Sequence, residues 1–210
     1  MLEPDSESMA AALMQARQTT LPKRLLAPGP DAAQLQAILG AAASAPDHGQ
    51  LMPWRFVLVP QAARARLAEV FGAALLERDA AATADQVQQA MDKAFRSPCL
   101  MLVVVQAAGG DPDIDLFERI VSAGAAVQNM LLMATAQGYG SALTSGKALK
   151  SQGLRRLFAL SASDHALCFV NIGTAHTSRQ GRVRPAPKDY VSTLEEQGLV
   201  PWPPASLATD

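Results

Sequence analysis

The sequence has few cysteines and no long apolar run, and these absences exclude several classes of protein. Its 210 residues include two cysteines, Cys99 and Cys168, each within an apolar segment. That usage indicates buried free thiols rather than a disulfide framework or a zinc site. No apolar stretch is long enough to span a bilayer. The N-terminal segment is acidic and has neither the basic nor the apolar region of a signal peptide. We therefore expect a soluble, cytoplasmic protein.

The charge balance gives no indication of a nucleic-acid partner. The chain has 18 Lys and Arg against 19 Asp and Glu, and no basic stripe is present. Apolar residues make up 49% and charged residues 18%, which predicts a sizeable core and argues against disorder. The length suits one domain, and no linker, repeat or change of composition divides it. We predict a single domain over residues 1–210 with an extended, proline-rich tail from about residue 185.

The usual self-sufficient catalytic motifs are missing as well. The three histidines, His48, His165 and His176, do not pair with a second ligand at metal spacing. There is no Gly-x-Ser-x-Gly elbow, no P-loop and no Gly-x-Gly-x-x-Gly after a predicted strand. The chain is therefore either not an enzyme or an enzyme whose cofactor supplies the reactive chemistry. We predict no metal site.

Hydrophobic periodicity predicts helices interspersed with three strands. The second helix begins at Asp31, with Gln34 completing a capping box, and residues 22–30 before it are predicted to form a loop. The other predicted helices cover residues 9–17 (capped by Ser8), 62–79, 85–95, 114–137 and 150–158, and the strands cover 54–59, 100–105 and 167–172. The strand at 100–105 is almost continuously apolar, which favours a central place in its sheet. This order predicts an α+β (mixed α/β layered) domain with more helix than strand.

The longest predicted helix, over residues 114–137, changes character along its length. Its first half is amphipathic, whereas residues 123–136 are apolar or small almost all round. A helix of that kind is buried, and in a chain of this size a second subunit could supply part of the cover. Gly138 and Gly140 provide the signal for its end.

Several polar segments are candidates for ligand binding, although each also has a plain structural interpretation. Arg17-Gln18-Thr19-Thr20 could hold a phosphate or could be a solvated helix end. The same two interpretations apply to the basic group Arg179, Arg182 and Arg184. The loop from Ser44 to His48 could carry function or could simply form a turn. Thr144-Ser145-Gly146 could face a ligand or close a turn.

Together these segments resemble the FMN-dependent nitroreductase family, and most closely its compact YdjA-like branch. The resemblance covers roughly residues 14–194. Four sets of segments carry it: Arg17-Gln-Thr19; Ser44-Ala-Pro-Asp-His48 with Met52-Pro-Trp-Arg-Phe56; Ser122-Ala-Gly124 with Val127-Gln-Asn-Met130 and Ala136-Gln-Gly-Tyr-Gly140; and Thr144-Ser-Gly146 with Gly173-Thr174. The second and third sets are specific in combination, and the first and fourth are weak alone.

The resemblance implies a fold, an assembly and an activity. The implied fold is a central, mainly antiparallel sheet flanked by helices, with a long buried central helix. The implied assembly is an interlocked homodimer with FMN at the interface. The implied activity is oxidation of NADH or NADPH and reduction of nitro, quinone or similar small-molecule acceptors by a ping-pong hydride mechanism. The flavin N5 carries this chemistry, so no side chain is expected to be catalytic.

The family's pattern also implies site residues. Arg17 would bind the FMN phosphate, and Gln18 and Thr19 the phosphate or ribityl chain. Ser44 and His48 would face the flavin, and Lys23 or Arg24 its pyrimidine edge. The residues along the isoalloxazine ring would be Leu143, Thr144 and Ser145. Arg182 and Arg184 are candidates for a second phosphate contact. The nicotinamide cofactor would bind at Met133, Ala134, Thr135, Ala136, Gln137 and Gly138.

The chain departs from the family's pattern at three places, and one of them is an insertion of two residues around Leu21-Pro22, before Lys23 and Arg24. Gln18 stands where the family usually has a second arginine, and Leu143-Thr144 stand where the branch has Trp-Arg. Two other functions are compatible with the sequence: a flavin-binding or storage protein without efficient turnover, and a helical structural protein without a ligand. The visible spectrum of the purified protein separates the last of these from the other two.

Overall fold

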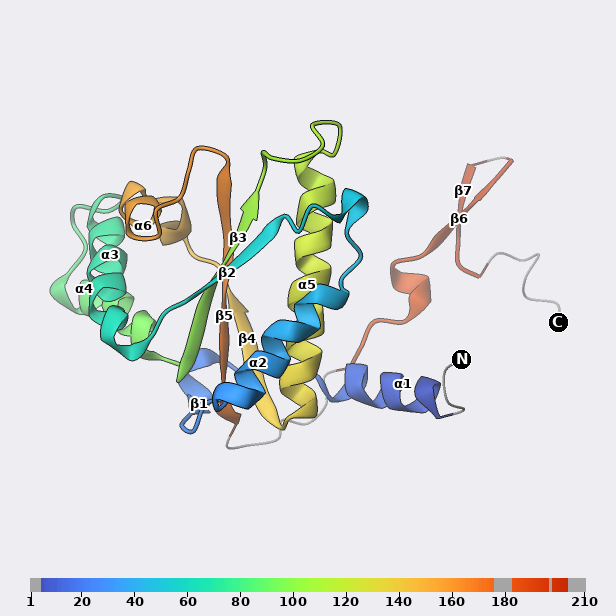
Figure 1. Ribbon diagram of the computed structural model, residues 1–210, viewed down its shortest axis with the longest axis horizontal. Helices are drawn as coiled ribbons and strands as arrows, with labels where there is room; N and C mark the ends of the chain where they lie inside the picture. The colour runs from blue at the N-terminus through green and yellow to red at the C-terminus, as the bar shows by residue number, and fades with distance from the viewer. Residues whose placement is uncertain (1–4, 176–182, 197, 204–210) are drawn as a thin grey trace. The chain divides into compact units, whose positions relative to one another are not determined.

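The computed structural model describes residues 5–175, 183–196 and 198–203 (Figure 1). The chain forms two compact units, Met1–Thr177 and Ser178–Asp210. The first contains a five-stranded sheet and all the α-helices of the described residues. The second contains the 3-10 turn η7 (Pro187–Asp189) and a hairpin of β6 (Ser192–Glu195) and β7 (Gly198–Pro201). The single domain with an extended tail stays a prediction.

The sheet of the first unit is built around one long strand, β5 (Asp164–Ala175). β3 (Cys99–Gln106) pairs with it on one side and β4 (Tyr139–Thr144) on the other. β2 (Trp54–Leu58) pairs with the outer side of β3, and β1 (Leu25–Leu26) pairs with the end of β5. Every pairing between these strands is antiparallel, as the resemblance implies.

The three predicted strands are confirmed, but two further strands of this sheet, β1 and β4, and the two strands of the β6–β7 hairpin were not predicted. β3 lies between β5 and β2, which agrees with the central place expected from its apolar run. At β4 the sequence predicts the end of a helix followed by a turn, and at β1 it predicts part of a loop. The β4 segment Tyr-Gly-Ser-Ala-Leu-Thr includes a glycine, a serine and an alanine, which are poor strand formers. The β4 segment is nevertheless a strand because it pairs with an edge of β5. That partner lies about thirty residues further along the chain, so the local sequence does not reveal the pairing.

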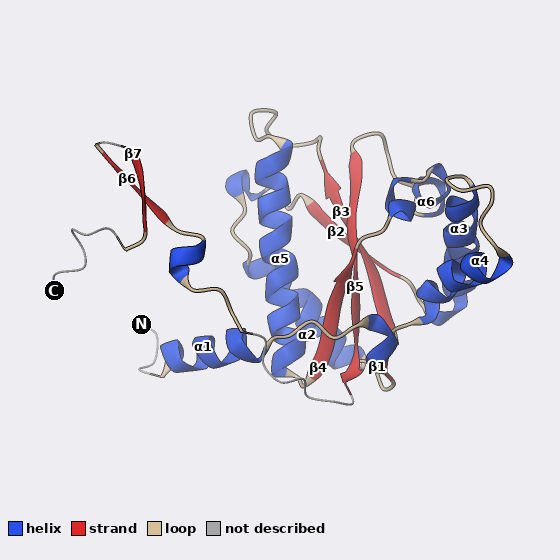
Figure 2. Ribbon diagram, turned by 180° about the vertical axis from the view of Figure 1, so that it is seen from behind, coloured by secondary structure: helices blue, strands red, loops and turns tan. Residues whose placement is uncertain are grey.

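Two layers of helices cover the sheet (Figure 2). α2 (Ala32–Ala41) and α5 (Leu116–Ala136) lie on one face. α3 (Arg64–Leu76), α4 (Ala84–Met91) and α6 (Gln152–Leu157) lie on the other. α1 (Ser6–Ala16) precedes the sheet. The remaining 3-10 turns of the described residues are η1 (Pro22–Arg24), η2 (Ala42–Ser44), η3 (His48–Gln50), η4 (Gln61–Ala63), η5 (Asp92–Phe95) and η6 (Lys147–Lys150).

The local signals for helix ends are only partly confirmed. The capping box of α2 is present: Gln34 N donates to Asp31 Oδ1 at 2.9 Å, and Asp31 N donates to Gln34 Oε1 at 2.9 Å. The prediction for α1 is wrong at its start, since the helix begins at Ser6 and Ser8 lies inside it. Asp5, the observed N-cap, is as favourable a capping residue as Ser8, so the sequence left the exact start open.

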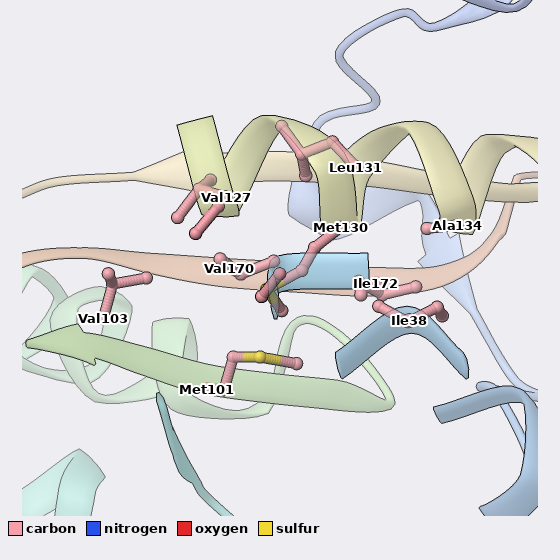
Figure 3. Packing of buried hydrophobic residues seen from close by; sticks show 11 residues of the cluster. Ile38, Met101, Val103, Val127, Met130, Leu131, Ala134, Val170 and Ile172 are labelled. Atoms are coloured by element: carbon pink, nitrogen blue, oxygen red, sulfur yellow. The ribbon is translucent and has the colours of Figure 1, made fainter. Parts of the chain in front are cut away.

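A hydrophobic core lies on each face of the sheet because successive strand residues point to opposite sides. Met101 and Val103 of β3 pack towards α2 and α5 (Figure 3). Leu102 and Val104 pack towards α3 and α6. The two helical layers therefore hold β5, the strand between β3 and β4, from both sides.

The long helix α5 is buried on one face rather than all round. Met130 and Ala134 pack into the core beside the sheet (Figure 3). On the opposite face the side chains of Phe117 and Val121 are 75% and 69% exposed, and Gly124 is exposed as well. A single chain thus leaves an apolar stripe along this helix uncovered.

Candidate functional site

The structure brings two of the predicted ligand-binding segments together at β4. Thr19 forms a parallel bridge with Ser141, and Thr20 N donates to Ser141 O at 2.9 Å. The segment Arg17-Gln18-Thr19 therefore runs beside β4, whose last residues are Leu143 and Thr144. Arg17 and Gln18 are half-buried and Thr19 is exposed.

Two glycines of the family-like segments permit this close packing. Gly140 and Gly173 are cross-strand partners in the β4–β5 pair. A Cβ on Gly140 would lie 2.8 Å from Thr20 Oγ1, and one on Gly173 would lie 2.7 Å from Pro98 Cδ. Both distances are shorter than a carbon atom tolerates, so Gly140 permits the approach of the first segment to β4, and Gly173 permits the approach of Pro98 to β5.

A cavity of about 590 Å³ opens where β4 ends. Its volume lies within the range typical of small-molecule sites. Thr144 and Ser145 form part of its wall, together with the start of η6 and side chains of α3, α4 and η5. The buried residues of its lining are mostly apolar, namely Ala90, Leu100, Leu149 and Phe169, with one buried amide, Asn171.

The rim of the cavity is basic. Arg78, Lys93 and Lys147 are exposed there and Arg96 is half-buried, against a single carboxylate, Asp79. Lys23 and Arg24, the predicted cations for the flavin's pyrimidine edge, do not line the cavity, although the neighbouring Pro22 does. Their proposed contact stays a prediction.

Asn171 is a site residue that the sequence analysis missed. Its Nδ2 donates to Thr144 Oγ1 at 3.0 Å, and its Oδ1 accepts from Ser97 Oγ at 3.0 Å. A signal for it existed: an amide interrupts the apolar run Leu167–Ile172 that predicts the strand. A buried amide in such a strand must have hydrogen-bond partners, which marks it for attention.

His48 and Ser44 lie away from this cavity. His48, in η3, places its Nδ1 2.8 Å from Glu118 Oε2 at the start of α5. The hydrogen bond and the negative charge of Glu118 raise the pKa of His48, with Asp111 and Asp47 adding to the effect. Ser44 is exposed at the end of η2. Their contact with a flavin stays a prediction.

The segment predicted for the nicotinamide cofactor lies at the junction of α5 and β4. Met133 to Ala136 form the last turn of α5, and Gly138 has a φ of +83°. Ala134 is completely buried in the core, so its side chain has no free surface for a ligand. Of the two predicted tail arginines, Arg182 lies outside the described residues and Arg184 belongs to the second unit.

Comparison with solved structures places this architecture in a known fold. A nitroreductase-like protein from Bacillus cereus superposes with a TM-score of 0.77 at 19% identity, covering 93% of this chain and 99% of that one. A nitroreductase with bound FMN from Desulfitobacterium hafniense gives 0.62 at 20% identity, covering 93% and 100%. The first unit thus has the nitroreductase-like α+β fold.

Sequence comparison gives the family. The model of the nitroreductase family matches residues 16–174. A "Putative NAD(P)H nitroreductase" of Haemophilus influenzae is 33% identical, over 82% of this chain and 93% of the relative. The protein named "Putative NAD(P)H nitroreductase YdjA" of Escherichia coli K12 is also 33% identical, over 80% and 91%. The chain belongs to the nitroreductase family.

Among the helices of the described residues, none is long and apolar enough to cross a membrane. In the same residues, no group of three or more His, Cys, Asp or Glu side chains is placed to hold a metal ion.

Proposed function

We propose that this protein is an FMN-dependent oxidoreductase that takes electrons from NADH or NADPH and passes them to a small-molecule acceptor. The observation that carries the proposal is the bridge between Thr19 and Ser141, which joins the segment of Arg17 to the middle of β4, the strand that ends at the cavity. Membership of the nitroreductase family and the FMN named for a protein of the same fold support it. FMN, when bound, supplies hydride chemistry that no amino-acid side chain offers.

The residues present fit this cofactor. The first segment provides a guanidinium and a hydroxyl, a donor set that suits a phosphate and a ribityl chain. The end of β4 provides the Thr144 and Ser145 hydroxyls beside a cavity with a largely apolar lining, which suits a planar ring with polar edges. Arg17, Gln18 and Thr19 would hold the phosphate end, and Leu143, Thr144 and Ser145 would contact the ring.

The chain's own residues bind and orient rather than react. No histidine or cysteine is among the cavity-lining residues of the described chain, and Asp79, its single carboxylate, is exposed. The cations of the rim favour negative charge on a bound ligand. One site used in turn by the nicotinamide cofactor and the acceptor predicts ping-pong kinetics. Within the segment from Met133 to Gly138, the residues other than the buried Ala134 are proposed to contact the nicotinamide cofactor.

We also propose that the protein acts as a homodimer in the cytoplasm with FMN at the interface. The exposed stripe of Phe117 and Val121 on α5 provides an apolar surface for a second copy. Ser44 and His48, which lie away from the cavity of their own chain, would then face the flavin at the interface.

The test begins with colour and continues with turnover. Purified protein should show flavin absorbance, or gain it when FMN is added. It should then oxidise NADH or NADPH with a quinone or a nitroaromatic compound, giving parallel double-reciprocal plots. A colourless protein that takes up no FMN contradicts the proposal. Flavin uptake without turnover would instead favour the alternative, a flavin-binding or storage protein.

Arg17 should matter more for FMN binding than Lys23. Loss of a charge-assisted hydrogen bond costs about 1.5–3 kcal/mol, so Arg17→Ala should raise the Kd of FMN roughly ten- to a hundredfold. Lys23 is exposed and does not line the cavity, so Lys23→Ala should change the Kd less. Titration of apoprotein with FMN measures both, and the reverse order would contradict the assignment of Arg17 to the phosphate.

A further inference from the structure

Asn171 is a polar residue in an otherwise apolar part of β5. Its side chain is 2% exposed, between Val170 and Ile172. Burial of an amide is unfavourable unless both of its ends form hydrogen bonds. Here Ser97 Oγ lies 3.0 Å from the oxygen end of the amide and 3.0 Å from Cys99 O, so these two acceptors share its one proton, and the nitrogen end donates to Thr144 Oγ1 at 3.0 Å. Asn171 therefore links Ser97, which lies shortly before β3, to Thr144, the last residue of β4.

The backbone determines which way this amide points. Asn171 Nδ2 also faces the carbonyl oxygen of Ala142 at 3.4 Å. A carbonyl oxygen only accepts hydrogen bonds, so the nitrogen and not the oxygen of the amide must face β4. The amide orientation thus follows from chemistry as well as from the placement of the atoms.

This orientation decides the role of the Thr144 hydroxyl. Because Asn171 donates to Thr144 Oγ1, that oxygen is the acceptor and its own proton must be donated elsewhere. Within the described part of the chain, no acceptor is bonded to that proton. Thr144 is paired with Phe169, so its side chain lies on the same face of the sheet as Phe169 and Asn171. All three line the cavity, so the proton is available to a molecule bound there.

We propose that Ser97, Asn171 and Thr144 form a hydrogen-bond chain that sets Thr144 as a donor to the ring of the bound cofactor. Asn171 is a positioning residue, and Thr144 contacts the ligand through a carbonyl oxygen or a ring nitrogen of the flavin. This inference rests on the proposed function, because it takes the flavin as the molecule beside Thr144. A donor at such an atom stabilises the electron-rich reduced ring, so it raises the midpoint potential as well as the affinity.

The first experiment tests the hydroxyl of Thr144. Thr144→Val keeps the side-chain shape and removes the donor, and it should raise the Kd of FMN about fivefold, the size of one neutral hydrogen bond. The midpoint potential of the bound flavin should become more negative. Thr144→Ser keeps the hydroxyl and should restore both values. The matched control is Thr174→Val, since the Thr174 hydroxyl donates to Pro28 O at 2.7 Å at the other end of the β4–β5 pair.

The second experiment tests whether Asn171 acts through Thr144. Asn171→Leu removes the donor, and Asn171→Asp keeps the shape but offers only acceptors, which turns the Thr144 proton away from the cavity. Each should raise the Kd of FMN to a similar extent. In the Thr144→Val background neither should have a further effect, because the hydroxyl they orient is gone. Asn171→Asp keeps the test valid if the leucine variant does not fold, as judged by circular dichroism.

The outcomes separate this inference from the function on which it rests. Wild-type protein that binds FMN, with unchanged Kd and midpoint potential in Thr144→Val, overturns the hydrogen-bond chain alone. Effects of Asn171 and Thr144 that simply add overturn the positioning role of Asn171. Wild-type apoprotein that takes up no FMN contradicts the proposed function and this inference together.

Discussion

The buried arginines Arg64 and Arg119 donate hydrogen bonds to backbone carbonyl oxygens. Arg64 is 1% exposed, and it donates to Val59 O at 2.8 Å and to Ala94 O at 2.6 Å. Arg119 donates to Ile114 O at 2.9 Å and also to carbonyls of the loop before α5. Carbonyl dipoles stabilise these buried charges and the guanidinium groups tie loops to helices. The exposed and half-buried cations of the cavity rim have no such partners among the described residues, so they are the ones available to a ligand.

The two free thiols, which were predicted to be buried, are half-buried, and they predict how stability depends on alkaline pH. Burial raises the pKa of Cys168 to about 11 from an ordinary value of 9.0, and it raises the pKa of Cys99 as well. The native state therefore holds the thiol protons more tightly than the unfolded state. The stabilisation from Cys168 is complete below pH 9 and is lost as the pH rises towards 11, by roughly 3 kcal/mol in all. Urea unfolding at several pH values measures this decline.

Cys168→Ala provides the control for this prediction. The substitution removes the ionisable group, so the free energy of unfolding should fall less steeply above pH 9 than in the wild type. The remaining decline should belong to Cys99 and other groups. Equal slopes for the two proteins would show that Cys168 titrates alike in the folded and unfolded states.

At the level of elements, two helices begin with the same capping box but in different surroundings. In α4, Gln86 N donates to Thr83 Oγ1 at 3.3 Å, and Thr83 N donates to Gln86 Oε1 at 2.9 Å. In α2, Gln34 makes the corresponding bonds with Asp31, and its Oε1 also accepts from Tyr139 Oη at 2.7 Å. Gln34 therefore ties the start of α2 to the start of β4, whereas Gln86 acts within its own helix.

This difference predicts unequal effects of the same substitution. Gln86→Ala should lower the free energy of unfolding by about 0.5 kcal/mol, through its cap alone. Gln34→Ala should cost about 1 kcal/mol more, because the half-buried Tyr139 hydroxyl loses a partner. Urea denaturation measures both. In a Tyr139→Phe background, Gln34→Ala and Gln86→Ala should lower the free energy of unfolding by equal amounts. If Gln34→Ala still costs more there, the Tyr139 hydroxyl is not the cause of the difference.

At the level of the whole molecule, the uncovered face of α5 predicts the assembly. Phe117 and Val121 are 75% and 69% exposed on one stripe of a helix whose other face is core. If a second copy covers them, the mass in solution should be twice 22.1 kDa. Val121→Glu places a charge in the proposed interface and should give a monomer, with less FMN bound if the cofactor lies at that interface as proposed. Light scattering after gel filtration measures the mass.

A matched control separates dimer loss from general damage. Leu76, on α3, is 44% exposed and lies on the opposite side of the sheet from α5. Leu76→Glu should leave both the mass and the FMN content unchanged. A Val121→Glu protein that remains dimeric would place the interface elsewhere.

The sequence alone determined the features that depend on neighbouring residues. The cap of α2 at Asp31, the course of α5 and the apolar run of β3 follow from local hydrogen bonding and periodicity, so short-range patterns predict them. For the candidate site, the residues alone left Thr144 and Ser145 between a ligand contact and a turn, and only the family resemblance placed them beside the flavin. Both line the cavity, and their contact with a ligand stays a prediction.

Only the tertiary structure decided what depends on distant partners. β4 is a strand because β5 lies beside it, and the Arg17 segment reaches β4 because Thr19 pairs with Ser141. Asn171 looks like an irregularity in its own strand and gains a role only from Ser97 and Thr144, each far away in the chain. Such contacts leave little trace in local periodicity, because their free energy comes from packing and pairing that only the folded chain brings about.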